Sequence, residues 1–163
     1  MPESLDRTDL KLLALLQQDG RASVQTLSES VHLSARATLS RVRRLEERGL
    51  ITGYRALLNR AAVGPAISMF AEIALKDQRQ AASLRFEARM AATPEVVACY
   101  LVSGRYDYLV RIACRDLVQY QALINAWLED VALGIEKIVT NTELQTVKEF
   151  SGFPLNLAPH DAS

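Results

Sequence analysis

One predicted helix, from Ser34 to Gly49, carries the side chains of this 163-residue chain that are best suited to bind another molecule. Thr38, Val42 and Leu45 recur at helical spacing, so we expect them to hold one face of the helix against a core. The remaining face is basic and polar, and it carries Arg36, Ser40, Arg41 and Arg44. A short helix, a tight turn and then a basic helix predict a helix-turn-helix, whose second helix lies in the major groove of DNA.

The arginines of this helix are expected to contact different parts of the DNA. Arg36, near the helix start, is the best candidate to read a base, whereas Arg41 and Arg44 would reach bases or phosphates. Arg43 and Arg48 are expected to meet the phosphate backbone or nothing. The predicted DNA-binding residues are Ser34, Arg36, Ser40, Arg41, Arg43 and Arg44. The alternative is a solvated helix face whose arginines pair with Glu46, Glu47 and other acids along the helix.

Local signals predict the helices that position this face. Asp6 is expected to cap a first helix that ends at Asp19-Gly20, Ser23 a second, and Ser34 the basic third. His32 and Leu33 would form the turn between the second and third helices. Residues 50–54 alternate like a strand, which predicts the start of a wing. The first predicted domain, residues 1–54, is therefore a winged helix-turn-helix.

The charge of the chain is unevenly distributed. Residues 1–60 hold 10 Lys and Arg against 7 Asp and Glu, a net +3, while residues 61–163 hold 9 against 12, a net −3. A weakly basic domain makes few phosphate contacts alone, so we expect it to bind DNA as a dimer or a higher assembly. The sequence has neither a signal-peptide pattern nor 18 consecutive apolar residues, which favours the cytoplasm.

The rest of the chain is predicted to form a second domain over residues 66–150, after a linker at 55–65 and before a tail at 151–163 whose end is loose. Strands are expected around 69–75, at 96–103, at 107–114 and at 135–147. A helix at 78–92, with Leu84 and Ala88 on one face, and another from Leu117 to Val131 separate them. This βαββαβ order is typical of a ferredoxin-like α+β fold, an antiparallel sheet with both helices on one face. The open face predicts a homodimer.

Several motifs of the chain, in order, resemble the Lrp/AsnC family of transcriptional regulators. They are Leu5-Asp6-Arg7-Thr8-Asp9, Arg41-Val42-Arg43-Arg44-Leu45-Glu46, Gly49-Leu50-Ile51-Thr52-Gly53-Tyr54 and Val102-Ser103-Gly104-Arg105-Tyr106-Asp107-Tyr108. The resemblance implies a bacterial or archaeal regulator of amino-acid metabolism that is dimeric, often octameric, and responsive to a small effector, usually an amino acid. The family often has proline where this chain has Ala35 and Ala37, so the docking angle and target sequence do not carry over.

The predicted hairpin loop at Gly104-Arg105-Tyr106-Asp107 has two readings. It is either a simple turn or a place where backbone amides and a carboxylate meet the carboxylate and ammonium of an amino acid. The family resemblance favours the second reading, because it implies an effector bound between dimers at this loop and the last strand. The implied effector-binding residues are Gly104, Tyr106, Asp107, Thr140 and Thr142.

The sequence offers little for catalysis. Its two histidines, His32 and His160, lie in the predicted turn and in the tail, and Cys99 and Cys114 lack the spacing of a zinc or redox site. No glycine pattern matches a phosphate-binding loop, so we expect no enzyme activity, no cofactor and no metal. Two alternatives are haem-pathway decarboxylases, which resemble this family and use the same two domains, and an effector-binding scaffold without DNA binding.

Overall fold

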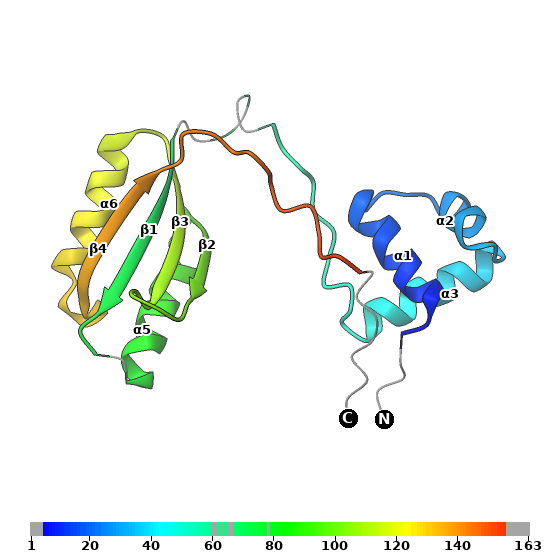
Figure 1. The fold of residues 1–163 in the computed structure, drawn as a ribbon, viewed down its shortest axis with the longest axis horizontal. Helices are drawn as coiled ribbons and strands as arrows, with labels where there is room; N and C mark the ends of the chain where they lie inside the picture. Colours follow the sequence, from blue (N-terminus) through cyan, green and yellow to red (C-terminus); the bar gives the residue numbers. More distant parts are fainter. Residues whose placement is uncertain (1–4, 60–61, 63, 65–66, 78, 156–163) are drawn as a thin grey trace. The chain divides into compact units, whose positions relative to one another are not determined.

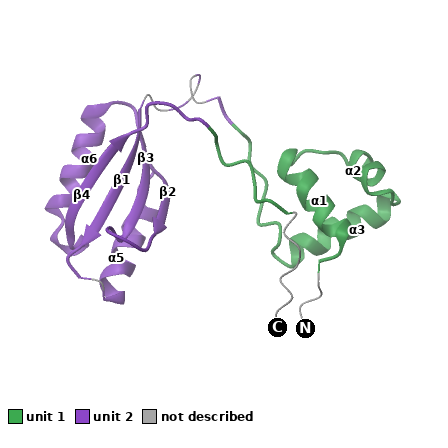
Figure 2. Cartoon of the chain, in the orientation of Figure 1, with its two compact units in different colours: residues 1–57, 148–163 green, residues 58–147 purple. Residues whose placement is uncertain are grey.

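The computed structural model describes residues 5–59, 62, 64, 67–77 and 79–155. It divides into two compact units (Figure 2). We call Met1–Leu57 with Lys148–Ser163 the helical unit, and Leu58–Val147 the sheet unit. The expected loose end of the tail, at 158–163, lies outside the described residues.

The helical unit contains three helices, α1 (Arg7–Gln18), α2 (Val24–Val31) and α3 (Ala35–Glu47) (Figure 1). Each begins at a predicted N-cap, whose side-chain oxygen accepts a hydrogen bond from a backbone amide of the first turn. The cap distances are 2.8 Å from Asp6 to the Asp9 amide, 3.0 Å from Ser23 to Thr26 and 3.2 Å from Ser34 to Ala37. The three predicted helix starts are confirmed.

A tight turn joins α2 to α3. His32 adopts the left-handed conformation (φ 56°) that commonly ends a helix, and the Leu33 amide donates to the Ser28 carbonyl at 3.1 Å. Leu12, Leu27 and Leu45 form the buried core between the three helices. Thr38 is also fully buried, so the predicted inward face of α3 is confirmed.

The strand predicted over residues 50–54 is wrong, because this segment contains no strand. The Leu50 and Ile51 amides both donate to the Leu45 carbonyl, at 2.9 and 3.2 Å, so they complete the end of α3. The Tyr54 hydroxyl then donates to Glu46 at 2.9 Å, and burial with this contact raises the pKa of Tyr54 to about 12. Of the apolar residues in this segment, Ile51 packs against the core of the helical unit, whereas Leu50 and Tyr54 remain partly exposed.

A C-terminal segment returns to the helical unit. The Gln17 side-chain amide donates to the Phe153 carbonyl at 3.2 Å, and its oxygen accepts from the Phe153 amide at 2.6 Å. Gly152 lies against the same side chain, and Phe150 contacts Phe153 edge to face with ring centroids 5.1 Å apart. The last described residues are thereby held on α1.

The sheet unit has the predicted βαββαβ order. Its elements are β1 (Ile67–Leu75), α5 (Gln80–Ala91), β2 (Val96–Leu101), β3 (Tyr108–Cys114), α6 (Leu117–Glu129), the short 3-10 helix η1 (Val131–Leu133) and β4 (Ile135–Thr142). The antiparallel strands are ordered β2-β3-β1-β4, and both helices cover one face of the sheet (Figure 1). This is the ferredoxin-like arrangement.

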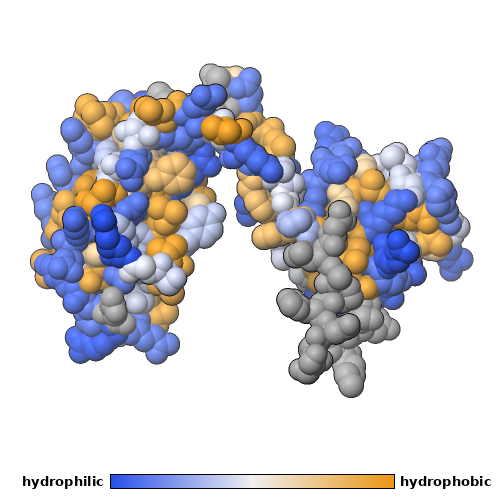
Figure 3. Space-filling model, in the orientation of Figure 1, coloured by the Kyte–Doolittle hydropathy of each residue, from blue (hydrophilic) through white to orange (hydrophobic). Residues whose placement is uncertain are grey.

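The core of the sheet unit is apolar. Alternate side chains of β1 and β3 are buried against α5 and α6, around Phe86, Tyr108 and Trp127. Leu84 and Ala88 do share a face of α5, but that face is exposed, because the buried residues of α5 are Ala82, Phe86 and Met90. Several large apolar side chains remain on the surface (Figure 3), among them Val97, Tyr100 and Leu101 of the edge strand β2.

The last strand is shorter than predicted. It ends at Thr142 rather than at 147, and the Glu143 amide makes one more hydrogen bond, to the Ser68 carbonyl at 2.9 Å. Ser68 is the second residue of β1, so the pairing of β4 with β1 extends nearly to the first residue of that strand.

Candidate DNA interface and effector loop

The exposed face of α3 presents the first candidate site. Arg36, Ser40 and Arg43 are exposed, and their spacing of four and three residues places them on one stripe of the helix. Ser34 is exposed at the start of the same helix, where its hydroxyl already caps the Ala37 amide. The stripe therefore offers two cations and two hydroxyls on a capped helix, a combination suited to phosphates and base edges.

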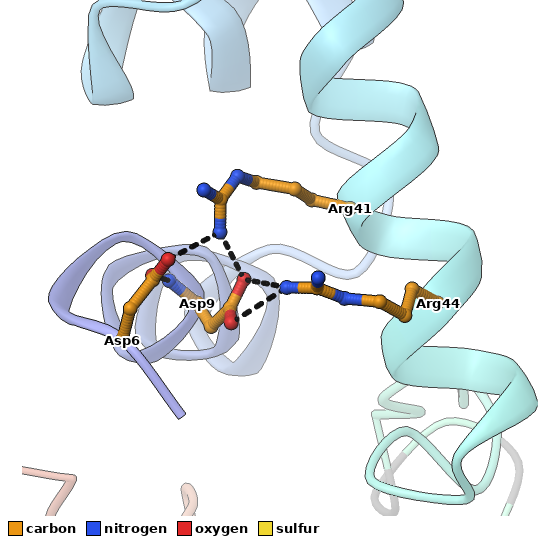
Figure 4. Close-up of polar contacts among 4 residues, drawn as sticks. All are labelled: Asp6, Asp9, Arg41 and Arg44. Atoms are coloured by element: carbon orange, nitrogen blue, oxygen red, sulfur yellow. Dashed lines mark hydrogen bonds and ion pairs between the residues drawn. The ribbon is translucent and has the colours of Figure 1, made fainter. Parts of the chain in front are cut away.

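Arg41 and Arg44 turn toward α1 instead (Figure 4). Nη1 of Arg41 lies 2.6 Å from Oδ2 of Asp6 and 2.8 Å from Oδ1 of Asp9. Nη2 of Arg44 lies 3.0 and 3.3 Å from the two carboxylate oxygens of Asp9. These arginines pair with acids, as the alternative reading proposed, but the acids lie on and before α1 rather than along α3.

Burial of one carboxylate distinguishes this cluster from a surface ion pair. The Asp9 side chain is only 1% exposed, whereas the Asp6 side chain is 48% exposed. The hydrogen bonds that Arg41 donates to the carboxylates of Asp6 and Asp9 raise the pKa of Arg41. The Asp9 amide and the Arg41 guanidinium lower the pKa of Asp6. A buried carboxylate needs such partners, because an unpaired charge in the interior is costly.

Sequence reasoning missed the role of Asp9 and gave Asp6 only a capping role. Both acids and both arginines belong to motifs quoted for the resemblance, yet nothing local shows that the motifs touch. Asp9 lies 32 residues from Arg41 and 35 from Arg44 along the chain. The sequence held one signal of this contact: two acids three residues apart in the first predicted helix region and two arginines three residues apart in the third.

The hairpin loop of the sheet unit is the second candidate site. Gly104 has φ 137°, in the region that favours glycine, and a Cβ there would meet no atom within 4 Å. Nη2 of Arg105 lies 2.8 Å from the Tyr106 hydroxyl. Asp107 lies where β3 begins, and its carboxylate accepts from the Leu75 amide at 2.7 Å while its own amide donates to the Ile73 carbonyl at 3.0 Å. Asp107 therefore joins the loop to the end of β1.

The structure does not bring Thr140 and Thr142 to this loop within one chain. They pair with Ala71 and Met69, whereas the loop lies at the Ile73 to Leu75 end of β1. Both threonines share the helix-covered face of β4, since their β1 partners Ala71 and Met69 are buried in the core. The Thr140 hydroxyl forms a hydrogen bond with the Tyr120 hydroxyl of α6.

Arg111 and Glu143 form a charged cluster on the open face of the sheet, which was not predicted from the sequence. Nη2 of Arg111 lies 2.9 and 3.1 Å from the carboxylate oxygens of Glu143, and its guanidinium lies 5.5 Å from the Phe70 ring centre. Hydrogen bonds from Ser68 and Thr146, together with Arg111, lower the pKa of Glu143 to about 2. The pair joins the end of β4 to β3 across β1.

A groove of about 390 Å³ lies between α5 and the edge strand β2. Its walls are mainly apolar, with the Tyr108 hydroxyl donating to Glu87 at 2.9 Å. Half-buried Cys99 contributes to the lining, and burial raises the pKa of its thiol, which disfavours a reactive thiolate. We find no cluster of metal-ligating side chains and no helix suited to cross a membrane among the residues with described positions.

Comparison with known proteins covers both units. Residues 5–52 match the family described as winged helix-turn-helix DNA-binding, and residues 68–153 match the Lrp/AsnC ligand binding domain. The chain is 42% identical to the transcriptional regulatory protein DoeX of Halomonas elongata, over 88% of this chain and 90% of that protein. It is 39% identical to the Bkd operon transcriptional regulator of Pseudomonas aeruginosa, over 93% and 98%.

Solved structures show the same fold. A transcriptional regulator of Neisseria meningitidis in complex with L-Met superposes with a TM-score of 0.86 at 30% identity, covering 94% of this chain and 98% of that one. An AsnC family transcriptional regulator from Agrobacterium tumefaciens superposes with a TM-score of 0.85 at 29% identity, covering 93% and 97%.

Proposed function

The chain belongs to the Lrp/AsnC family of transcriptional regulators, and we propose that it binds operator DNA through α3 and an amino-acid effector through its hairpin loop. The observation that carries the DNA proposal is the exposed stripe of Arg36, Ser40 and Arg43 on a capped helix. Arg36, near the helix start, is the base reader, and Arg43 meets phosphate. Arg41 and Arg44 are weaker candidates for DNA contact, because both guanidinium groups are paired with Asp9.

A homodimer provides the second recognition helix. One helical unit neutralises few phosphates, and two copies bind half-sites about one helical turn apart or a multiple of it. The open face of the sheet, which carries Phe70, Leu109 and Val139, is our proposed dimer surface because it leaves apolar side chains uncovered by the helices.

The effector site that we propose is centred on Gly104, Tyr106 and Asp107. The loop amides are suited to the effector carboxylate, and the Asp107 carboxylate is suited to its ammonium. The L-Met complex of the Neisseria regulator supports an amino acid as the ligand class. Thr140 and Thr142 are weaker candidates that would come from another copy, and an effector at Thr140 would have to displace the Tyr120 hydrogen bond.

We propose no enzymatic role and a cytoplasmic location. The relatives are named as transcriptional regulators, and such proteins act where the chromosome lies. The decarboxylase alternative relies on histidine around a porphyrin, whereas the sheet unit, residues 58–147, has no histidine in its sequence.

Binding to the region upstream of its own gene, measured across a salt series, tests the DNA proposal. Affinity should fall steeply with salt, and the slope should scale with the number of phosphates contacted. Absent or salt-independent binding would reject DNA regulation and leave the scaffold alternative.

A thermal-shift screen against the common amino acids tests the effector proposal, since a ligand that binds only the folded state raises the melting temperature. Asp107→Asn should abolish the shift, because it keeps an acceptor for the Leu75 amide but removes the charge for the ammonium. Glu136→Gln, on an exposed residue of β4, is the matched control. A shift that persists in the Asn variant places the effector elsewhere.

A further inference from the structure

The ion cluster between α1 and α3 is built around one carboxylate. Asp9 is almost completely buried, and it receives Arg41 and Arg44 from two positions three residues apart on α3 (Figure 4). Positions three apart lie on the same side of a helix about one turn from each other. One buried acid on α1 therefore holds α3 at two levels along its axis.

Two attachment points restrain the rotation of a helix more than apolar packing does. The core contacts of α3, Thr38 and Leu45, are non-directional, whereas charge-assisted hydrogen bonds have preferred distances and angles. A rotation of α3 that moved Arg36 and Arg43 by a few ångströms would stretch the bonds from Arg41 and Arg44 to Asp9.

We propose that Asp9 is a positioning residue for sequence recognition, an inference that rests on the proposed DNA binding by α3. Through Arg41 and Arg44 it fixes the rotation of α3 that presents Arg36, Ser40 and Arg43 to the bases. Arg41 and Arg44 then contribute little to phosphate neutralisation, because their guanidinium groups are used inside the unit.

Asp6 provides an internal comparison. Asp6 shares Nη1 of Arg41 with Asp9, but the Asp6 side chain is half exposed. The two hydrogen bonds given above for Arg44 both go to Asp9. In Asp6→Asn the asparagine can still cap α1, and the bond from Arg41 to Asp9 remains. The outer acid can therefore be neutralised without releasing α3.

The test uses the full chain and a duplex selected by the wild-type protein from a random pool. The specificity ratio is the affinity for this duplex divided by that for a scrambled duplex. Asp9→Asn and Asp9→Glu, measured below their melting temperatures with folding checked by circular dichroism, should lower the ratio at least about tenfold. Asp6→Asn should leave it within about twofold.

A salt series separates positioning from direct contact. Arg43→Gln should reduce the magnitude of the salt slope by about 0.9 per subunit, the value for one lost phosphate contact. Arg41→Gln and Arg44→Gln should leave the slope nearly unchanged, and Arg44→Gln should lower the specificity ratio.

The outcomes are distinguishable. If the wild-type protein selects no sequence, the proposed function fails and this inference falls with it. If it selects one while folded Asp9→Glu and Asp9→Asn keep the wild-type ratio, Asp9 is only structural. A slope loss in Arg41→Gln and Arg44→Gln equal to that in Arg43→Gln would make these arginines phosphate ligands and overturn the proposal.

Discussion

The helical unit and the sheet unit bury different chemistry. Among the described residues, the helical unit buries three leucines and, beside them, the charged Asp9 and the polar Ser28 and Thr38. The sheet unit buries a large apolar cluster that includes Trp127, Phe86 and Tyr108. The sheet unit is therefore stabilised mainly by apolar burial, which any shape-matched side chain can supply. The helical unit depends more on directional caps and ion pairs, which fix the orientation of α3.

The largest effect should come from the apolar core. Phe86 is fully buried with its ring centre 4.5 Å from that of Tyr108, so Phe86→Ala should lower the free energy of unfolding by about 3–5 kcal/mol. Urea denaturation followed by fluorescence measures this in the sheet unit, because Trp127 is the only tryptophan. Leu84→Ala, on the exposed face of the same helix, should change it by no more than about 0.5 kcal/mol. Equal losses would show that the core is not where the structure places it.

The ion pair between Arg111 and Glu143 is an exception to the mainly apolar stabilisation of the sheet unit. Glu143→Gln should lower the stability of the sheet unit at pH 7 by about 1.5–3 kcal/mol, because it removes the charge that Arg111 binds. The folded-state pKa is lowered to about 2, so this stabilisation is complete above the ordinary value of 4.5 and is lost as the pH falls toward 2.

Denaturation at several pH values checks this prediction. The Gln variant should lose part of the acid sensitivity of the wild-type protein between about pH 5 and pH 2. Glu136→Gln, on an exposed residue of the same strand, should keep the wild-type profile. Identical profiles for the wild type and Glu143→Gln would mean that the pair contributes nothing measurable.

A smaller loss of stability, confined to the helical unit, should follow removal of the N-cap of α3. Ser34→Ala removes the cap of α3 and should cost the helical unit about 1 kcal/mol, while Ser34→Asn, a good N-cap, should restore it. The loss should appear in the circular-dichroism transition and leave the Trp127 fluorescence transition unchanged, since Trp127 lies in the sheet unit. A shift of both transitions together would show that the units unfold as one.

The smallest effect should come from the C-terminal segment. A Cβ at Gly152 would lie 2.4 Å from Oε1 of Gln17, so Gly152→Ala should displace that side chain and break its two bonds to Phe153. Because the segment is exposed, we expect a global loss below about 0.5 kcal/mol but faster hydrogen exchange at the Phe153 amide. Gly53→Ala, which also has positive φ but open space around it, should leave that exchange rate unchanged. An unchanged exchange rate of the Phe153 amide in Gly152→Ala would contradict the two hydrogen bonds between Gln17 and Phe153.

Predictions that rested on local signals were confirmed. Asp6, Ser23 and Ser34 cap the three helices, because a cap depends on residues only three positions away. Predictions about how far a pattern extends were less accurate. The alternation at 50–54 and beyond Thr142 suggested strands, but a strand exists only where another strand pairs with it. The face of α5 that contacts the sheet also depends on tertiary packing, which favoured Phe86 and Met90 over Leu84.

The sequence by itself determined where the helices begin, the βαββαβ order, the basic character of α3 and the family to which the chain belongs. The tertiary structure decided which arginines face outward. Arg36, Arg41, Arg43 and Arg44 share one side-chain chemistry and one helix, so residue type alone does not distinguish them. Asp9 distinguishes them, because packing of α1 on α3 buries its carboxylate and a buried charge must be paired. For this physical reason, the stripe of α3 that we propose to meet DNA is narrower than the set of residues predicted from the sequence.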